Sequence, residues 1–155
     1  MTTPADATAV VIDTNVALDL LVFDDPAAQP LRHALELRQL RWLITQPMLD
    51  EARRVLDYPL IARRREARGL SVDAVMARWV SLTMVVPEAP KAPYTCKDGD
   101  DQRFVDLAAQ HRAWLLSKDA AVLCMAKRLA RLGAVVLRQW PGQTNANESV
   151  RALTQ

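Results

Sequence analysis

Cysteine and histidine are scarce in this sequence, and neither is arranged as a set of metal ligands. The two cysteines, Cys96 and Cys124, show neither CxxC nor zinc-finger spacing, which argues against a structural zinc site or a disulfide framework. The two histidines, His33 and His111, form no ligand pair either. We therefore expect two free thiols in a protein that works in a reducing compartment.

Long apolar runs, low-complexity tracts and a strong excess of one charge are also lacking. No stretch reaches the roughly 18 apolar residues of a membrane-spanning helix, and residues 1–6 contain no basic segment of the kind that opens a signal peptide. We expect a cytoplasmic protein without membrane contact. The net charge is only +2, and most of the positive charge is arginine, which favours planar contacts with phosphate and hence nucleic acid as a partner.

Five short apolar runs alternate with segments of helical periodicity, and the 155 residues suit one domain. The predicted strands are residues 9–12, 41–45, 82–86, 113–116 and 134–137. Strands that alternate with helices indicate a parallel sheet covered on both faces, which is a three-layer α/β/α architecture with a central five-stranded sheet. We expect a single domain over residues 1–140 and a loosely held C-terminal tail over residues 141–155.

Capping residues and prolines delimit the helices between these strands. Asn15 and Ser71 are each predicted to cap a helix, because their side-chain oxygens can accept from the free amides of a first turn. An apolar helical stripe is expected over 31–40. Pro59 breaks the arginine-rich segment 53–68, whose charges suit either a solvated helix face or a surface that contacts phosphates.

Four acidic residues are placed to reach the carboxyl edge of the predicted sheet, where ligands of open α/β folds bind. Asp13 directly follows the first strand, and Asp119 follows the fourth. Glu51 lies on the helix after the second strand, one turn from the apolar Met48 and Val55, so it borders the buried face. Asp101 precedes the apolar positions of a later helix by one and two turns. A carboxylate behind β-branched residues, as at Asp13, is partly desolvated and needs a partner.

Taken singly, these carboxylates have ordinary explanations. Asp101 and Asp119 stand where helices begin, and a carboxylate there stabilises a helix by about 1 kcal/mol, while most helical glutamates such as Glu51 are simply solvated. Several carboxylates on one rim, however, repel each other unless a cation lies among them. An all-oxygen ligand set suits Mg²⁺ or Mn²⁺. Such a site can activate a water against a phosphodiester, so metal-dependent hydrolysis is the chemistry indicated.

Four motifs occur in an order that resembles the PIN-domain ribonucleases, and the likeness runs from about residue 9 to residue 137. It looks most like the branch described as toxin components of toxin–antitoxin systems. The motifs are VVIDTN at 10–15, LDEARRVL at 49–56, DDQRFVDLA at 100–108 and SKD at 117–119.

The resemblance implies a three-layer PIN-like fold and cleavage of single-stranded RNA by metal-activated water, with Mg²⁺ or Mn²⁺ as the cofactor. It further implies a homodimer and a small antitoxin protein as inhibitor. The catalytic and metal-ligating residues that it implies are Asp13, Glu51, Asp101 and Asp119, with Asn15 and Ser117 in support and Asp100 as the alternative third ligand. Serine at position 117 replaces the more usual threonine.

Three alternatives remain on the sequence alone. A PIN-like module that only binds RNA or protein would bind independently of metal and hydrolyse nothing. A receiver-like phospho-acceptor domain needs an aspartate at the end of its third strand, where this chain has Val86, Pro87 and Glu88. A haloacid-dehalogenase-like phosphatase needs a second aspartate two residues after the first, and Asn15 occupies that place.

Overall fold

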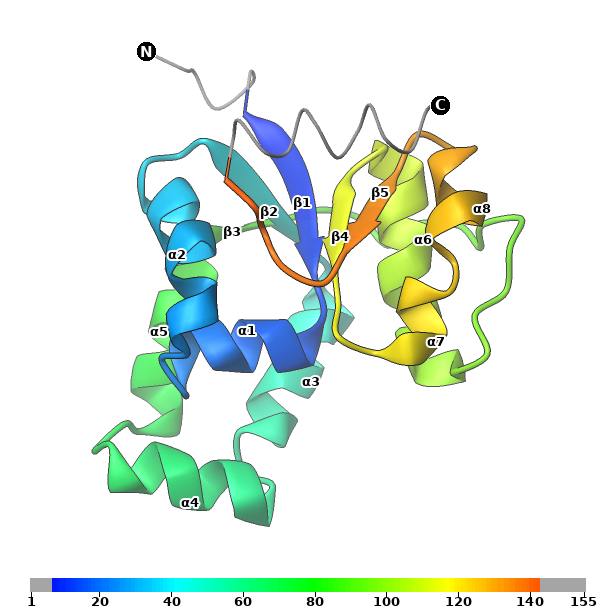
Figure 1. Cartoon of the computed structure of the whole chain (residues 1–155). Coiled ribbons are helices and arrows are strands. Elements are labelled where there is room, and N and C mark those ends of the chain that lie inside the picture. The colour runs from blue at the N-terminus through cyan, green and yellow to red at the C-terminus, as the bar shows by residue number, and fades with distance from the viewer. Residues whose placement is uncertain (1–6, 143–155) are drawn as a thin grey trace.

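A five-stranded, all-parallel sheet forms the centre of the molecule, in the strand order β3-β2-β1-β4-β5 (Figure 1). The computed structural model describes residues 7–142. The strands are β1 (Thr8–Ile12), β2 (Leu40–Ile44), β3 (Thr83–Val85), β4 (Trp114–Leu116) and β5 (Val135–Leu137). Each predicted strand is present within one residue or two at its ends, and the predicted parallel sheet is confirmed.

Helices cover both faces of this sheet, which confirms the three-layer architecture. The chain runs outward from β1 to β3 and then returns to β4 and β5, so right-handed crossovers place the helices of the two halves on opposite faces. Figure 1 shows α1, α2 and α5 on one side and α6, α7 and α8 on the other. The helices are α1 (Thr14–Leu21), α2 (Gln29–Glu36), α3 (Gln46–Val55), α4 (Pro59–Ala67), α5 (Val72–Leu82), α6 (Gln102–His111), α7 (Ala120–Leu123) and α8 (Ala126–Ala130), with 3₁₀ turns η1 (Pro26–Ala28) and η2 (Gly99–Asp101).

The central pairing of β1 with β4 sets the position of the first acidic residue. Ile12 is in register with Leu116, and the amide of Asp13 continues the ladder by donating to the Leu116 carbonyl at 2.9 Å. The residue after Leu116 is Ser117, so Asp13 and Ser117 leave the sheet side by side. The side chains of Ala9 to Ile12 in β1 are buried, because a parallel sheet is covered on both faces.

Two helix predictions are wrong in detail. Helix α1 begins at Thr14 with Asp13 at the N-cap position, so Asn15 lies inside the first turn and does not cap. Helix α2 ends at Glu36, and Arg38 takes a left-handed conformation with φ of 57°, so the predicted stripe does not extend to Leu40. Leu40 is buried as the first residue of β2 instead. A left-handed residue ends the helix because it turns the chain out of the helical path.

Other local predictions are confirmed. Ser71 caps α5 by accepting from the Ala74 amide at 3.1 Å, and the arginine-rich segment is broken at Pro59, where α4 begins. Both cysteines are free. At the C-terminal end of the described residues, the Trp140 ring packs edge-on against Trp114, with centroids 5.0 Å apart. Most of the predicted tail, residues 143–155, lies outside the described residues.

No helix within residues 7–142 is long and apolar enough to cross a membrane.

Candidate metal site at the carboxyl edge of the sheet

Asp13 is held at the end of β1 by its neighbour on β4. It is 5% exposed, and the hydroxyl of fully buried Ser117 donates to its Oδ2 at 2.7 Å. The Ser117 hydroxyl oxygen in turn accepts from the amide of Asp119 at 3.1 Å. This chain of hydrogen bonds links the ends of two adjacent strands and fixes the Asp13 carboxyl group in one orientation.

Burial raises the pKa of Asp13 above its ordinary value of 3.8. The hydrogen bond from Ser117 and the nearby amide of Thr14 oppose this effect, because they stabilise the ionised carboxylate, whereas the charge of Asp119 adds to it. Asp13 therefore stands in an environment that is short of positive charge. A cation at this position would offset the cost of burying the ionised Asp13 carboxylate and the repulsion between it and Asp119.

Asp101 approaches the same edge from the turn that precedes α6. It is 8% exposed, and its Oδ2 is buried without a hydrogen-bond partner among the described residues. Burial raises the pKa of Asp101 to about 7, with further contributions from a hydrogen bond to Asp119 and from the charges of Asp13 and Asp119. Asp13 and Asp101 line the same cavity, and one carboxylate oxygen of Asp101 lies within 4.8 Å of one of Asp119.

Asp119 and Asp98 complete the acidic surroundings of Asp101. One carboxylate oxygen from each of Asp98, Asp101 and Asp119 lies within 4.8 Å of the other two. Asp119 caps α7 by accepting from the Ala121 amide at 2.9 Å, so its predicted capping role and its place in the cluster coexist. We call Asp13, Asp98, Asp101 and Asp119 the acidic cluster.

Sequence reasoning did not select Asp98 as a site residue. Its side chain accepts from the Asp100 amide at 2.9 Å, which makes it the cap of the turn η2. The spacing Asp98-x-x-Asp101 was the available signal, since residues three apart in a tight turn lie on one side. Asp100, the alternative third ligand, is exposed and lies outside the trio of Asp98, Asp101 and Asp119.

A cavity of about 230 Å³ opens beside the acidic cluster, and Glu51 is one of the residues that line it. Glu51, Asp13 and Asp101 line it together, as do Asn15 and Asp100. Helix α3 positions Glu51 half-buried at the rim, where it forms an ion pair with Arg103 of α6. That ion pair was not expected from the sequence. It fixes the Glu51 carboxylate next to the site and balances its charge.

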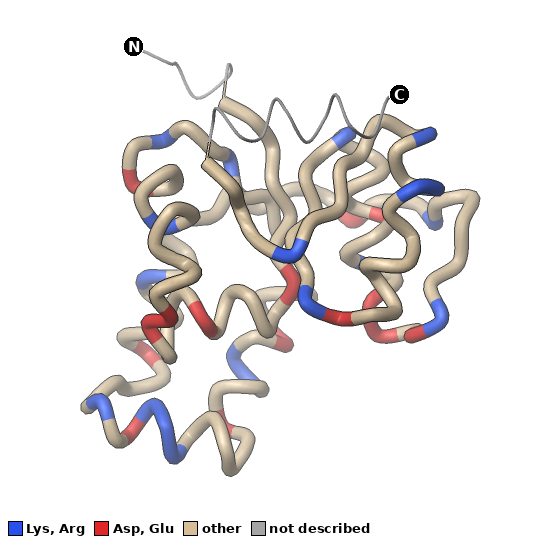
Figure 2. The backbone as a smooth tube through the Cα atoms, in the orientation of Figure 1, with Lys and Arg blue, Asp and Glu red and all other residues tan. Residues whose placement is uncertain are grey.

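The residues present fit a hard divalent cation. The donors are carboxylate oxygens, the ligand type that Mg²⁺ and Mn²⁺ prefer. The unpartnered Oδ2 of Asp101 is a buried polar atom that needs a partner, and such atoms cost about 1–3 kcal/mol when left unsatisfied. Figure 2 shows the acidic segments gathered near the carboxyl ends of the strands, on both halves of the sheet.

The arginines of segment 53–68 divide between structural and exposed positions. Arg65 is buried, and its guanidinium donates to the carbonyls of Leu56 at 3.2 Å and Leu70 at 2.8 Å. Arg64 lies over the Phe23 ring, 4.3 Å from its centroid. These contacts of Arg64 and Arg65 therefore help to hold α4 in place. Neither a solvated helix face nor a phosphate-contacting surface, the two roles predicted for this segment, describes the buried Arg65.

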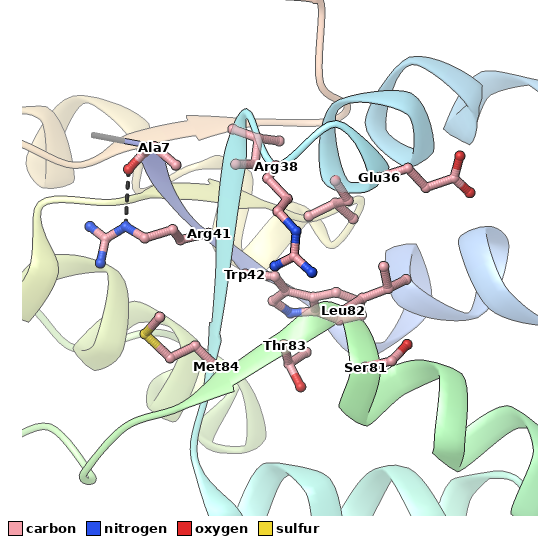
Figure 3. Close-up of a pocket in the computed structure, with 11 residues that line it drawn as sticks. Ala7, Glu36, Arg38, Arg41, Trp42, Ser81, Leu82, Thr83 and Met84 are labelled. Carbon is pink, nitrogen blue, oxygen red and sulfur yellow. Dashed lines mark hydrogen bonds between the residues drawn. The ribbon is translucent and has the colours of Figure 1, made fainter. Parts of the chain in front are cut away.

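A larger cavity, of about 390 Å³, lies at the other end of the strands, near the start of β1 and β2 (Figure 3). Its charged lining residues are Arg38, Arg41 and Glu36, and Arg41 donates to the Ala7 carbonyl at 3.0 Å. Glu36, the one carboxylate in this lining, pairs with Arg78 at 3.3 Å. This cavity cannot gather several oxygen ligands around a cation, so the carboxyl edge is the candidate site.

The fold and the site together define a class: a parallel α/β domain that gathers carboxylates at the carboxyl ends of its strands, two of which, Asp13 and Asp101, are buried. A family model described as the PIN domain matches residues 9–121, which is more than half of the chain. The chain belongs to the PIN domain family. It thus has a nuclease-type fold with an acidic cluster compatible with divalent-metal binding. A search of curated proteins and a search of solved structures each found no match.

Proposed function

We propose that this protein is a Mg²⁺- or Mn²⁺-dependent endoribonuclease that hydrolyses phosphodiester bonds of single-stranded RNA. The observation that carries the proposal is the unpartnered, buried Oδ2 of Asp101 within a cluster of carboxylates. A domain that only bound RNA would gain nothing from concentrating negative charge where phosphates must approach. A divalent cation held there would offset much of this negative charge and would offer a positive centre to a phosphate oxygen.

In this proposal, the cation is held by the catalytic set that the sequence predicts, and Asp98 joins that set from the turn η2. A bound ion would supply two things there: activation of a water as nucleophile and neutralisation of charge on the phosphodiester. The predicted catalytic and metal-ligating residues are Asp13, Glu51, Asp101 and Asp119.

The remaining residues of the site act by positioning these carboxylates. Ser117 orients Asp13 through the 2.7 Å hydrogen bond, and Asn15 lines the cavity from the first turn of α1. Arg103 holds Glu51 at the rim through their ion pair. The Arg103 side chain remains about one-third exposed, so its positive charge can also attract a phosphate of the incoming strand.

Further parts of the proposal concern the surroundings of the enzyme. We propose a homodimer in the cytoplasm, inhibited by a cognate antitoxin protein, because the motifs resemble toxin-like PIN domains. Light scattering of the purified protein at several concentrations tests the dimer. A strictly monomeric mass at all concentrations would contradict it.

An RNA-cleavage assay tests the central activity. Purified protein with Mn²⁺ should cut an unstructured RNA, and chelation with EDTA should stop the cleavage. Asp13→Asn and Asp101→Asn should abolish cleavage while leaving the circular dichroism spectrum unchanged. Asp50→Asn is the matched control, because Asp50 is an exposed carboxylate of α3 that bonds to Gln46 and lies outside the cavity.

The possible outcomes separate the alternatives. Metal-independent RNA binding without cleavage would favour a binding module over an enzyme. Cleavage by both site variants at the parental rate would assign the activity to a contaminant or to another site. Either result would overturn the proposed function.

A further inference from the structure

The cavity beside the acidic cluster has a second, apolar wall that metal binding does not require. Side chains from α1, α3, α4 and α6 and from the connection before α4 form this wall, and they line the same cavity of about 230 Å³ as the carboxylates. Three of its side chains, from Leu18, Val55 and Phe104, are largely buried and belong to the core. The other two, Tyr58 and Ile61, stand at the opening, and Tyr58 is 54% exposed.

The backbone around Tyr58 is firmly positioned. It lies in the short connection between α3 and α4, where its amide donates to the Val55 carbonyl at 3.0 Å. Its carbonyl accepts from the Ala62 amide at 2.8 Å, which closes the first turn of α4. Within residues 7–142 the Tyr58 side chain forms no hydrogen bond or ring contact. A partly exposed aromatic ring thus lines the cavity from a hydrogen-bonded turn, and it forms no ring–ring or cation–π contact within residues 7–142.

We propose that Tyr58 is a stacking platform for one unpaired nucleobase of the RNA, next to the phosphodiester at the acidic cluster. This inference rests on the proposed function and adds the subsite that selects single strands. An aromatic ring beside an apolar wall accepts the face of any base. The cation held by the carboxylates would attract the phosphate of the strand, so the uncharged base lies against the apolar wall.

The cavity also explains why the base must be unpaired. Bases in a duplex are stacked and hydrogen-bonded within the helix, so only a splayed base can enter a cavity of this size. Stacking does not depend on the hydrogen-bonding edge of the base, so the subsite provides affinity with little sequence preference. The Tyr58 hydroxyl is not needed for this role.

Tyr58→Ala, Tyr58→Phe and the control Leu60→Ala test the subsite. Leu60 is 71% exposed and lies two residues away on α4, but it does not line the cavity. The probe is a short unstructured RNA containing one 2-aminopurine, whose fluorescence falls when the base stacks on an aromatic ring. With Mn²⁺ present, stopped-flow mixing records binding before turnover, and initial rates on the same RNA give kcat and KM.

Tyr58→Ala should weaken binding and raise KM by about 5- to 150-fold, the range measured for loss of one base–aromatic stack. Its kcat should stay within about twofold of the parent, because the acidic cluster is unchanged. The fluorescence decrease should disappear in Tyr58→Ala and persist in Tyr58→Phe. Leu60→Ala should match the parent in every measurement.

The result that overturns the subsite is a parental fluorescence decrease and KM in Tyr58→Ala, or an equal loss in Leu60→Ala. If the parent binds and quenches the probe through Tyr58 but cuts nothing, the subsite stands and the proposed hydrolysis fails. If the parent cuts RNA independently of Tyr58, the hydrolysis stands and the subsite fails. If the parent neither binds nor cuts the probe, both proposals are wrong.

Discussion

Asp101→Asn should stabilise the metal-free protein, although it removes a site residue. The pKa of Asp101 is raised from 3.8 to about 7, so between these values the folded chain keeps a proton that the unfolded chain has lost. The unfolding free energy of the parent therefore falls as pH rises from about 4 to 7, and it stays reduced above that pH. Asparagine has no charge to bury and removes this penalty.

The magnitude follows from the pKa difference. At about 1.4 kcal/mol for each pH unit, the difference corresponds to at most about 4 kcal/mol. Water and salt reach the acidic cluster from its open side and screen the charges, so we expect about half of that value, or about 2 kcal/mol. The stabilisation should be fully present at pH 8 and absent below pH 4, where Asp101 is protonated in both states.

Urea unfolding in EDTA, followed by circular dichroism between pH 4 and pH 8, measures this effect. The matched control is Asp100→Asn, because Asp100 is the neighbouring carboxylate and is exposed. The control should follow the pH dependence of the parent. If Asp101→Asn also shows the parental pH dependence, or is less stable than the parent at pH 8, the inferred repulsion within the cluster is wrong.

Three further predictions follow from contacts in and around the site. Ser117→Ala should lower the unfolding free energy by about 1–3 kcal/mol, because the buried carboxylate of Asp13 loses a hydrogen bond. If the unfolding free energy measured in urea stays within about 0.5 kcal/mol of the parental value, this prediction is wrong. Arg65→Met should lower the unfolding free energy by about 2–3 kcal/mol in the same assay, since the carbonyls of two residues lose their donor. Its control is Arg63→Met, an exposed position, which should change the unfolding free energy by less than about 0.5 kcal/mol. Mn²⁺ should raise the Tm of the parent, measured by differential scanning fluorimetry, but not that of Asp101→Asn; equal shifts would place metal binding elsewhere.

The sequence predicts the parallel sheet and the positions of Asp13 and Asp119 at its carboxyl end, and the reason is physical. Buried parallel strands need continuous apolar runs, and a charged residue at the end of such a run lies at the edge of the sheet. Asp13 and Asp119 are both of this kind. The pairing of β1 with β4, which the alternation of strands and helices does not specify, then places them at adjacent strand ends.

The remaining details depend on contacts that local sequence does not encode. Asp98 lies at the end of a loop without regular structure, so its approach to Asp119 follows only from the folded path of the chain. The pairing of Glu51 with Arg103 joins two helices that are far apart in sequence. Arg65 resembles its exposed neighbours in the sequence, and the break at Pro59 allows α4 to turn its side chain inward.

The most direct measurement of the central claim is an anomalous difference map from a crystal of this protein soaked in Mn²⁺. We expect a peak bounded by carboxylate oxygens of Asp13, Asp101 and Asp119, at about 2.1 Å from its ligands. If the map has no peak at the carboxyl ends of the strands, or has peaks only on exposed carboxylates elsewhere, the acidic cluster is not a metal site.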